Sequence, residues 1–319
     1  MIADASTTPP NAALIQLERV SKWYGEVIGL NDVSTTIGAG ITGLLGPNGA
    51  GKSTLMGLVT GQLRPSLGRV RIFGERPWDR PRVLARIGYC PEGDRFWSKL
   101  TGYAFVLFLA RQSGLGGAEA HAATAAAIEA TQMTANMHRP IATYSKGMRQ
   151  RIKISQALVH QPQLLVLDEP FTGADPVARH ELSELFRRLA DEGVSILISS
   201  HVLHEVEALT QRILMIDRGR IVASGDLHTV REGLADRPHA IRIRVDAPRR
   251  VAEAMVALES VSALRWLDSE TLVVESSAPA EVHARLSEVV LGGGVILREV
   301  AAADESLEAV FEYLTERSR

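Results

Sequence analysis

The segment LLGPNGAGKSTLMGL (Leu44–Leu58) places a glycine-rich loop between an apolar pair and an apolar, helix-compatible run. Its centre, GPNGAGKS (Gly46–Ser53), fits the spacing G-x-x-x-x-G-K-[ST], in which glycines let backbone N–H groups turn inward around phosphate oxygens. The helix that follows adds the positive end of its dipole. A glycine-rich segment can also be no more than a turn, but the strand before it and the helix after it favour a phosphate-binding loop.

Side chains of this loop have distinct expected roles. We expect Lys52 to reach the β- and γ-phosphates of a nucleotide, Ser53 to offer its hydroxyl to Mg²⁺, and Thr54 to lie near the α-phosphate. The expected nucleotide-binding residues of the loop are Gly46, Asn48, Gly49, Gly51, Lys52, Ser53 and Thr54. The loop alone does not separate ATPases from GTPases or small-molecule kinases.

Acidic residues and a histidine end two later apolar strands. LLVLDEP (Leu164–Pro170) delivers Asp168, which suits a Mg²⁺ ligand acting through water, and Glu169, which we predict polarises the attacking water. Two such acids can also be an ordinary helix N-cap, but the glycine loop upstream favours the catalytic reading. His201 closes SILISSH; a lone histidine there is commonly structural, yet parallel sheets place ligands at these strand ends, so we predict a contact with the γ-phosphate.

Composition narrows the class of protein. The chain has 319 residues, of which 45% are hydrophobic and 23% charged, as in soluble globular proteins of one large and one small domain or two of middling size. A net charge of −2 argues against a dedicated nucleic-acid binder. The single cysteine, Cys90, cannot form an internal disulfide, which fits a reducing compartment.

The sequence predicts neither a signal peptide nor a membrane-spanning helix. The N-terminal stretch MIADASTTPPNAAL lacks the basic and apolar regions of a signal peptide, and we expect a disordered tail there. The longest apolar run, YAFVLFLA (Tyr103–Ala110), is far shorter than the roughly 20 residues that a spanning helix needs. We expect no membrane crossing in this polypeptide, although it can still bind a protein that crosses.

Strands alternate with helices over the first two thirds of the chain, which predicts an α/β fold with a parallel sheet. The expected strands lie at 14–20, 41–46, 70–73, 87–90, 164–168 and 195–200, with a closing hairpin over 213–217 and 220–225. The expected helices lie at 101–112, 118–131, 146–159 and 177–193, besides the one that follows the glycine loop.

The pattern changes after residue 226. A β-α-β-β-α-β order and a last helix at 306–317 predict a small α+β, ferredoxin-like domain. It has 10 Lys and Arg residues against 14 Asp and Glu, so we do not expect it to bind nucleic acid. The predicted organisation is a tail at 1–13, an ATP-binding domain at 14–226, a linker at 227–236 and the α+β domain at 237–319.

Two further segments complete a recognisable pattern. YSKGMRQR (Tyr144–Arg151) and GADP (Gly173–Pro176) lie in order between the glycine loop and His201. Together these segments resemble the ATP-binding subunit of an ABC transporter over about residues 14–226. The resemblance implies a P-loop NTPase fold, an ABC nucleotide-binding domain with a helical subdomain, and ATP with Mg²⁺ as ligands.

The resemblance also implies a homodimer. Ser145 and Gly147 match the key positions of the ABC signature, which in the family clamps the phosphate of ATP held by the other subunit. Asp175 matches the acid of the D-loop, and His201 the switch histidine. Dimerisation is therefore expected to build two composite sites, each with Lys52 from one chain and the signature of its mate.

An aromatic pair precedes the glycine loop. KWYG (Lys22–Gly25) resembles the family's A-loop, which implies that Tyr24 stacks on adenine. Trp23 is the rival, and we prefer Tyr24 because the family's aromatic residue directly precedes the glycine. The remaining alternative is an aromatic pair on the surface without a ligand.

The sequence departs from the family pattern in places. Tyr144 replaces the usual leucine of the signature and Lys146 a glycine, while Glu92 stands where the Q-loop usually has glutamine. Glu92 offers only acceptors when ionised, so we expect it to ligate Mg²⁺. The aromatic residues that follow are either core or the family's groove for a membrane subunit, and Trp97 is our candidate contact.

The expected function is transport driven by ATP hydrolysis. The short chain with one nucleotide domain resembles bacterial drug- and polysaccharide-exporter ATPases, whose permeases are separate membrane proteins. The resemblance thus implies an ATPase at the cytoplasmic face of the cell membrane, held there by a permease. The alternatives are an importer ATPase and a non-transport ABC ATPase acting on ribosomes or DNA, whose usual second nucleotide domain, coiled coil or zinc module we do not find in the sequence.

Overall fold

The computed structural model describes residues 13–94, 96–97, 99–232 and 239–302. The chain divides into two compact units, Met1–Asp226 and Leu227–Arg319. Nearly all of the predicted N-terminal tail lies outside the described residues. A short helix, α8 (Leu227–Glu232), stands at the start of the segment where we expected a linker.

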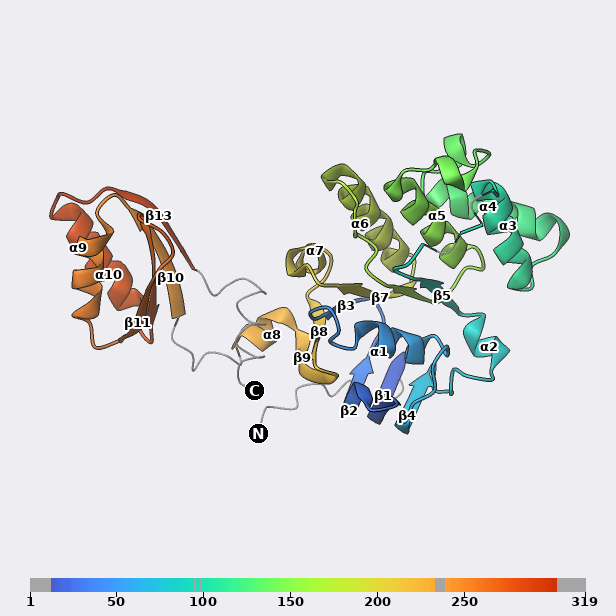
Figure 1. Cartoon of the computed structure of the whole chain (residues 1–319), viewed down its shortest axis with the longest axis horizontal. Helices are drawn as coiled ribbons and strands as arrows, with labels where there is room; N and C mark the ends of the chain where they lie inside the picture. The colour runs from blue at the N-terminus through green and yellow to red at the C-terminus, as the bar shows by residue number, and fades with distance from the viewer. Residues whose placement is uncertain (1–12, 95, 98, 233–238, 303–319) are drawn as a thin grey trace. The chain divides into compact units, whose positions relative to one another are not determined.

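The first unit is built on a six-stranded sheet in the order β5-β6-β7-β3-β8-β9 (Figure 1). Neighbouring strands pair in parallel except β8 and β9, which form the predicted hairpin. The strands are β3 (Ile41–Leu45), β5 (Ile87–Cys90), β6 (Leu164–Leu167), β7 (Ser195–Ser200), β8 (Arg212–Asp217) and β9 (Arg220–Asp226). Because β3, β5, β6, β7 and β8 are parallel, their carboxyl ends meet along one edge of the sheet.

A second, antiparallel sheet has the order β2-β1-β4. Its strands are β1 (Ile15–Tyr24), β2 (Val27–Ile37) and β4 (Leu67–Ile72). Helix α1 (Lys52–Val59) buries Leu55 and Leu58 in one core with residues of both sheets. We did not predict β2, whose polar residues interrupt the apolar alternation and whose Asp32 has a φ of 50° where the pairing with β1 is irregular.

Three helices gather beside the large sheet, as Figure 1 shows in green. Helices α3, α4 and α5 share a core that includes Val106, Ile128 and Ile152, and they form the predicted helical subdomain. The helices of the first unit after α1 are α2 (Pro81–Leu84), α3 (Gly102–Gln112), α4 (Gly117–Ala130), α5 (Lys146–Leu158), α6 (Pro176–Asp191) and α7 (Leu203–Glu207), with 3₁₀ turns at Thr134–Asn136 and Ile141–Thr143.

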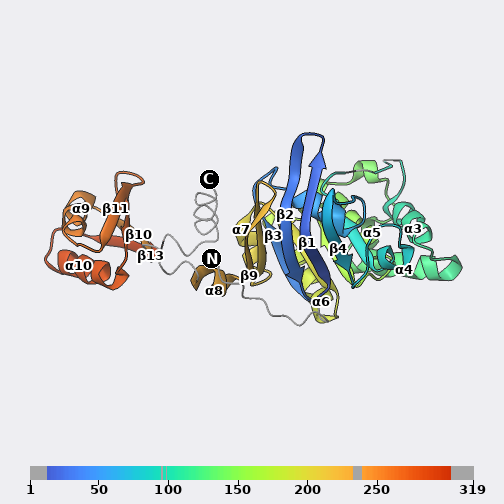
Figure 2. The ribbon, with the colours of Figure 1, turned by 90° about the horizontal axis from the view of Figure 1, so that it is seen from below.

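The second unit has the predicted β-α-β-β-α-β order after α8. Its elements are β10 (His239–Val245), α9 (Pro248–Val256), β11 (Val261–Trp266), β12 (Thr271–Ser276), α10 (Pro279–Leu291) and β13 (Leu297–Ala302). The strands form an antiparallel sheet in the order β11-β12-β10-β13, and both helices lie on one face of it (Figures 1 and 2). The last predicted helix, 306–317, lies outside the described residues, and the ferredoxin-like class of this unit stays a prediction.

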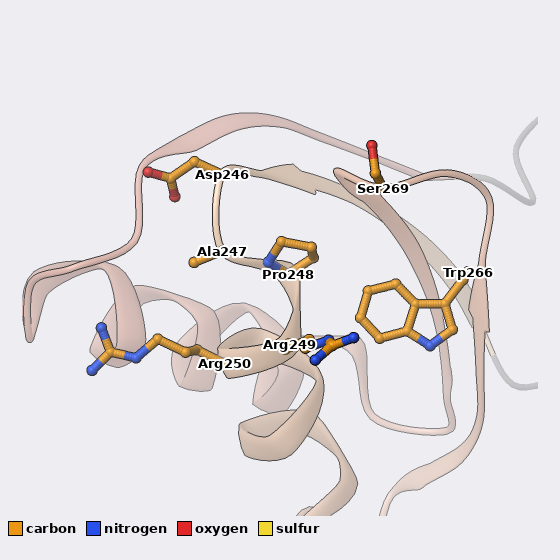
Figure 3. Close-up of a pocket in the computed structure, with 7 residues that line it drawn as sticks. All are labelled: Asp246, Ala247, Pro248, Arg249, Arg250, Trp266 and Ser269. Atoms are coloured by element: carbon orange, nitrogen blue, oxygen red, sulfur yellow. The ribbon is translucent and has the colours of Figure 1, made fainter.

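A hollow of about 540 Å³ opens at the start of α9 in the second unit (Figure 3). The Trp266 ring and the Arg249 guanidinium border it, and Ser269 lies at its rim. None of the residues that we predicted to bind nucleotide or metal lines this hollow. The residues predicted to bind nucleotide or metal all belong to the first unit.

Among residues 13–94, 96–97, 99–232 and 239–302, no helix combines the length and apolar character required to cross a bilayer.

Candidate nucleotide site

The glycine loop connects the end of β3 to the start of α1, as predicted. Gly49 and Gly51 have φ angles of 81° and 111°, which L side chains rarely adopt. A Cβ atom at Gly51 would lie 2.5 Å from the Gly29 carbonyl oxygen, and one at Gly46 would lie 2.2 Å from the Ile216 carbonyl oxygen. No side chain caps the N-terminus of α1. The loop thus keeps an uncapped helix start and a narrow backbone turn, which together suit a phosphate group.

The Lys52 side chain lies across this loop and is only 6% exposed. Its ammonium donates to the carbonyl oxygen of Gly46 at 2.7 Å and to that of Pro47 at 3.3 Å. It also lies 3.2 Å from Glu169 Oε1. The predicted phosphate-binding lysine and the predicted catalytic carboxylate are therefore brought together.

Asp168 follows the fully buried strand β6 and is itself 3% exposed. Its backbone N–H donates to the Cys90 carbonyl oxygen at 2.9 Å, and its Oδ1 accepts from the Ser199 hydroxyl at 2.8 Å. Burial raises the pKa of the Cys90 thiol to about 12, so that group stays a neutral thiol beside β6. The two hydrogen bonds hold Asp168 at the edge of the sheet that carries the glycine loop.

Glu169 has a φ of 50°, a left-handed conformation that turns its side chain out of the strand direction. Its backbone N–H donates to the Ser199 hydroxyl at 2.9 Å, which holds the turn. Its Oε2 lies 2.8 Å from His201 Nδ1. Its Oε1 is buried and faces the Lys52 ammonium at 3.2 Å, in an ion pair without hydrogen-bond geometry.

Tyr24 lies beside the start of α1, where the glycine loop ends. The Tyr24 hydroxyl is 3.4 Å from Thr54 Oγ1, and its ring covers Gly29, where a Cβ atom would come within 2.8 Å of it. The ring remains 46% exposed. A planar ring half open to solvent and one turn from the phosphate loop suits stacking on a nucleotide base.

Residues that fit Mg²⁺ do not form an all-protein cage. Among the described residues, no group of three or more His, Cys, Asp or Glu side chains is placed to hold a metal ion. Mg²⁺ commonly takes few protein ligands and completes its shell with phosphate oxygens and water, so the Ser53 hydroxyl and the Asp168 carboxylate are a suitable donor set. Glu92 is exposed on the loop after β5.

The signature residues lie at the N-terminus of α5. Ser145 is the N-cap and accepts from the Met148 N–H at 3.2 Å, while a Cβ atom at Gly147 would meet nothing within 4 Å. Tyr144 is 3% exposed, and its hydroxyl donates to the Asn136 carbonyl oxygen at 2.7 Å, which explains how it replaces leucine as a core residue. Within the described ranges, no hydrogen bond or ion pair joins Ser145 to Lys52, so the structure does not bring the two predicted phosphate clamps of one chain together.

The predicted D-loop has a structural role in this chain. Asp175 is the N-cap of α6 and accepts from the Ala178 N–H at 2.9 Å. The Lys146 side chain lies over Gly173, where a Cβ atom would come within 2.2 Å of its ammonium. The lysine that departs from the signature pattern is therefore accommodated by the absence of a side chain at Gly173.

Ser199 is the site residue that the sequence did not reveal. It is fully buried in β7, and its hydroxyl connects the Asp168 carboxylate to the Glu169 backbone. The pairing of Leu167 with Ile198 places it next to Asp168. The serine that follows the apolar run ILI in β7 was the available signal, but its partner depends on strand register.

A glycine loop between a parallel strand and a helix, with adjacent acids at the end of a nearby strand, defines a P-loop nucleotide hydrolase. Residues 30–172 match the family model described as ABC transporter. The chain is 34% identical over 274 residues to the Nod factor export ATP-binding protein I of Rhizobium johnstonii, covering 85% of this chain and 87% of that protein. It is 33% identical over 220 residues to an uncharacterised ABC transporter ATP-binding protein of Bacillus subtilis, covering 69% and 73%.

A solved structure gives the same family. The structure of an ATP-binding subunit of an ABC transporter matches with a TM-score of 0.61 at 31% identity, over 69% of this chain and 92% of that chain. This chain belongs to the ATP-binding proteins of ABC transporters. It is an ATPase subunit, and the ATP that it hydrolyses drives transport.

Proposed function

We propose that this chain drives export through a separate integral membrane permease, as a homodimer of ATP-binding subunits at the cytoplasmic face of the membrane. The main support for export, as opposed to import, is the extent of the similarity to the Nod factor export protein. That match covers 85% of the chain, although the first unit ends at Asp226, so the similarity extends into the second unit. An importer ATPase is the alternative within the family, and an ATPase acting on ribosomes or DNA is the alternative outside transport.

ATP is proposed to lie along the glycine loop. Tyr24 stacks on adenine, since its hydroxyl already lies 3.4 Å from Thr54 at the start of α1. The backbone of the loop surrounds the phosphates, and Lys52 neutralises the β- and γ-phosphate charge. Tyr24, the loop backbone and Lys52 all come from one chain, so nucleotide binding does not need a second copy.

Mg²⁺ is proposed to be held by Ser53 directly and by Asp168 through water, with Glu92 as a further acceptor. When bound, the ion neutralises charge on the triphosphate. Ser199 keeps the Asp168 carboxylate in place through its 2.8 Å hydrogen bond. The Glu92 side chain is exposed on the loop after β5, so its position is the least constrained of the three proposed ligands.

Glu169 is proposed to orient and polarise the attacking water. Its Oε2 contacts His201, which fixes the carboxylate, and its Oε1 faces Lys52. When phosphate draws the Lys52 ammonium away, Oε1 becomes free to accept a proton from water. His201 lies against Oε2 of Glu169, whereas Lys52 faces Oε1, and we propose that His201 also contacts the γ-phosphate.

The second clamp is proposed to come from a second copy of this chain. Ser145 is exposed at the start of α5 and makes no hydrogen bond to the phosphate loop of its own chain. Gly147 leaves space for a phosphate beside it. With Asp175 of the D-loop, these residues complete the site of the mate, and hydrolysis reopens the dimer.

A hollow beside Trp97 is proposed to receive the permease. It measures about 260 Å³ and is lined by Phe96, Trp97 and Phe105 among other residues. The Trp97 ring packs edge-on against Phe108 with ring centres 5.0 Å apart, yet is 54% exposed. An exposed aromatic ring on a packed aromatic base suits an apolar helix of a partner protein.

A pull-down tests the proposed function. Tagged Glu169→Gln, held with MgATP in its native host, is recovered from solubilised membranes and its partners are identified. A polytopic membrane protein in stoichiometric amount supports the transport role and identifies the permease. Ribosomal proteins or DNA-repair factors without a membrane partner would overturn the proposed export while leaving the ATPase chemistry intact.

A further inference from the structure

An acidic residue two positions after the predicted Mg²⁺ ligand Glu92 contacts the signature helix α5. Asp94 Oδ2 accepts from Arg149 Nε at 2.8 Å, and Asp94 Oδ1 lies 3.2 Å from Lys153 Nζ. Arg149 and Lys153 are four residues apart on α5, so both cations project from one face of that helix toward a single carboxylate.

Each of these cations also holds a backbone carbonyl. Arg149 Nη1 donates to the Tyr144 carbonyl oxygen at 2.6 Å, immediately before Ser145. Lys153 Nζ donates to the carbonyl oxygens of Glu92 at 2.7 Å and Pro91 at 3.1 Å. The bonds therefore form a continuous connection from the backbone of Glu92, through the carboxylate, to the residue before the signature serine.

This cluster is not a loose surface pair. The Lys153 side chain is only 5% exposed, and those of Arg149 and Asp94 are 32% and 40% exposed. Removing the Asp94 carboxylate therefore leaves the buried Lys153 ammonium without its anion.

We propose that Asp94 is a positioning residue that fixes Ser145 relative to Glu92. This inference rests on the proposed function, in which Glu92 acts on the nucleotide of its own chain and Ser145 on that of the mate. Asp94 then links the geometry of the two composite sites, because a shift of the Glu92 loop moves the start of α5 with it. Asp94 is not among the residues that we propose to bind nucleotide or metal.

The test separates positioning from simple stabilisation. Asp94→Asn keeps the shape but removes the charge, and we expect kcat for ATP hydrolysis to fall about tenfold or more, since small misplacements of a clamp are costly. Nucleotide binding to the loop, measured in the Glu169→Gln background with a fluorescent ATP analogue, should stay within about twofold, because Lys52 and Tyr24 are untouched. Asp94→Glu should recover part of kcat.

Further variants complete the design. The double variant Asp94→Asn with Arg149→Gln should be no slower than the slower single variant, as expected for groups that act through one connection. Asp79→Asn is the matched control, since Asp79 forms an exposed ion pair with Arg64 far along the chain from the signature. It should leave kcat unchanged.

The outcomes are distinguishable. Wild-type kcat in Asp94→Asn overturns the inference, as does an equal loss of kcat, thermal stability and nucleotide affinity, which would indicate a purely structural pair. If Ser145→Ala also hydrolyses ATP at the wild-type rate, the proposed composite site is wrong, and so is the role of Asp94 that rests on it. If Ser145→Ala is impaired and Asp94→Asn is not, the composite site stands and only the role of Asp94 is wrong.

Discussion

Lys52 and Glu169 form a buried ion pair: Nζ lies 3.2 Å from Oε1, and the side chains are 6% and 7% exposed. Both are proposed to act on the same phosphate, one by binding it and the other by activating the water that attacks it. A nucleotide that recruits Lys52 therefore also changes the surroundings of Glu169. We infer that the pair couples nucleotide binding to the activation of the Glu169 carboxylate.

Removing one partner of this pair should be more harmful than removing both. We expect Lys52→Met to lower the free energy of unfolding by about 3–5 kcal/mol, because it leaves the buried Glu169 charge facing only His201. Lys52→Met combined with Glu169→Gln should recover part of that loss. Urea unfolding of the single and double variants measures the coupling. Strictly additive effects would show that the two charges do not stabilise each other.

The sequence predicted the elements whose signals are local. The glycine loop, the apolar strands β6 and β7 and the signature helix each carry their own pattern, and the structure has them near the predicted bounds. Strand β2 was missed because Asn31 and Asp32 interrupt its apolar alternation. The bonds of Ser199 to Asp168 and of Asp94 to Arg149 join residues distant in sequence, so they depend on register and packing that no local pattern encodes.

Ser199→Ala should impair the metal side of the site. It removes the donor to Asp168 and leaves the buried Glu169 N–H without an acceptor, which costs about 1–3 kcal/mol of stability. We also expect a higher Mg²⁺ concentration for half-maximal ATP hydrolysis. Ser183→Ala is the matched control, since that hydroxyl donates to the Arg179 carbonyl oxygen within α6. Equal behaviour of the two variants would exclude a specific role for Ser199.

Tyr24 and Trp23 can be separated by nucleotide affinity. Tyr24→Ala should weaken ATP binding by about 1–3 kcal/mol through loss of base stacking, whereas Tyr24→Phe should bind nearly as wild type. Trp23→Ala should leave the affinity unchanged, since within the described part of the chain Thr54 bonds Tyr24 and no hydrogen bond joins it to the Trp23 side chain. Calorimetric titration of the three variants with ATP checks this. The reverse ranking would move the adenine contact to Trp23.

Trp97→Ala should uncouple the subunit from its permease. The ring is largely exposed, so basal hydrolysis by the purified chain should persist, while stimulation by the reconstituted permease should be lost. Trp266→Ala, which removes an exposed tryptophan of the second unit, serves as the control and should keep that stimulation. A Trp97→Ala protein that fails to fold would instead assign the ring to the core around Phe105.

The most direct test of the central claim is the molar mass of Glu169→Gln with and without MgATP, measured by light scattering. The variant keeps the Lys52 loop and the Ser145 signature but lacks the group that activates water, so its hydrolysis should fall by about 10²–10⁴-fold. The account predicts a shift from 34.6 kDa to a dimer of twice that mass when MgATP is added. A protein that binds ATP yet stays at 34.6 kDa would contradict the composite site formed by two copies of this chain.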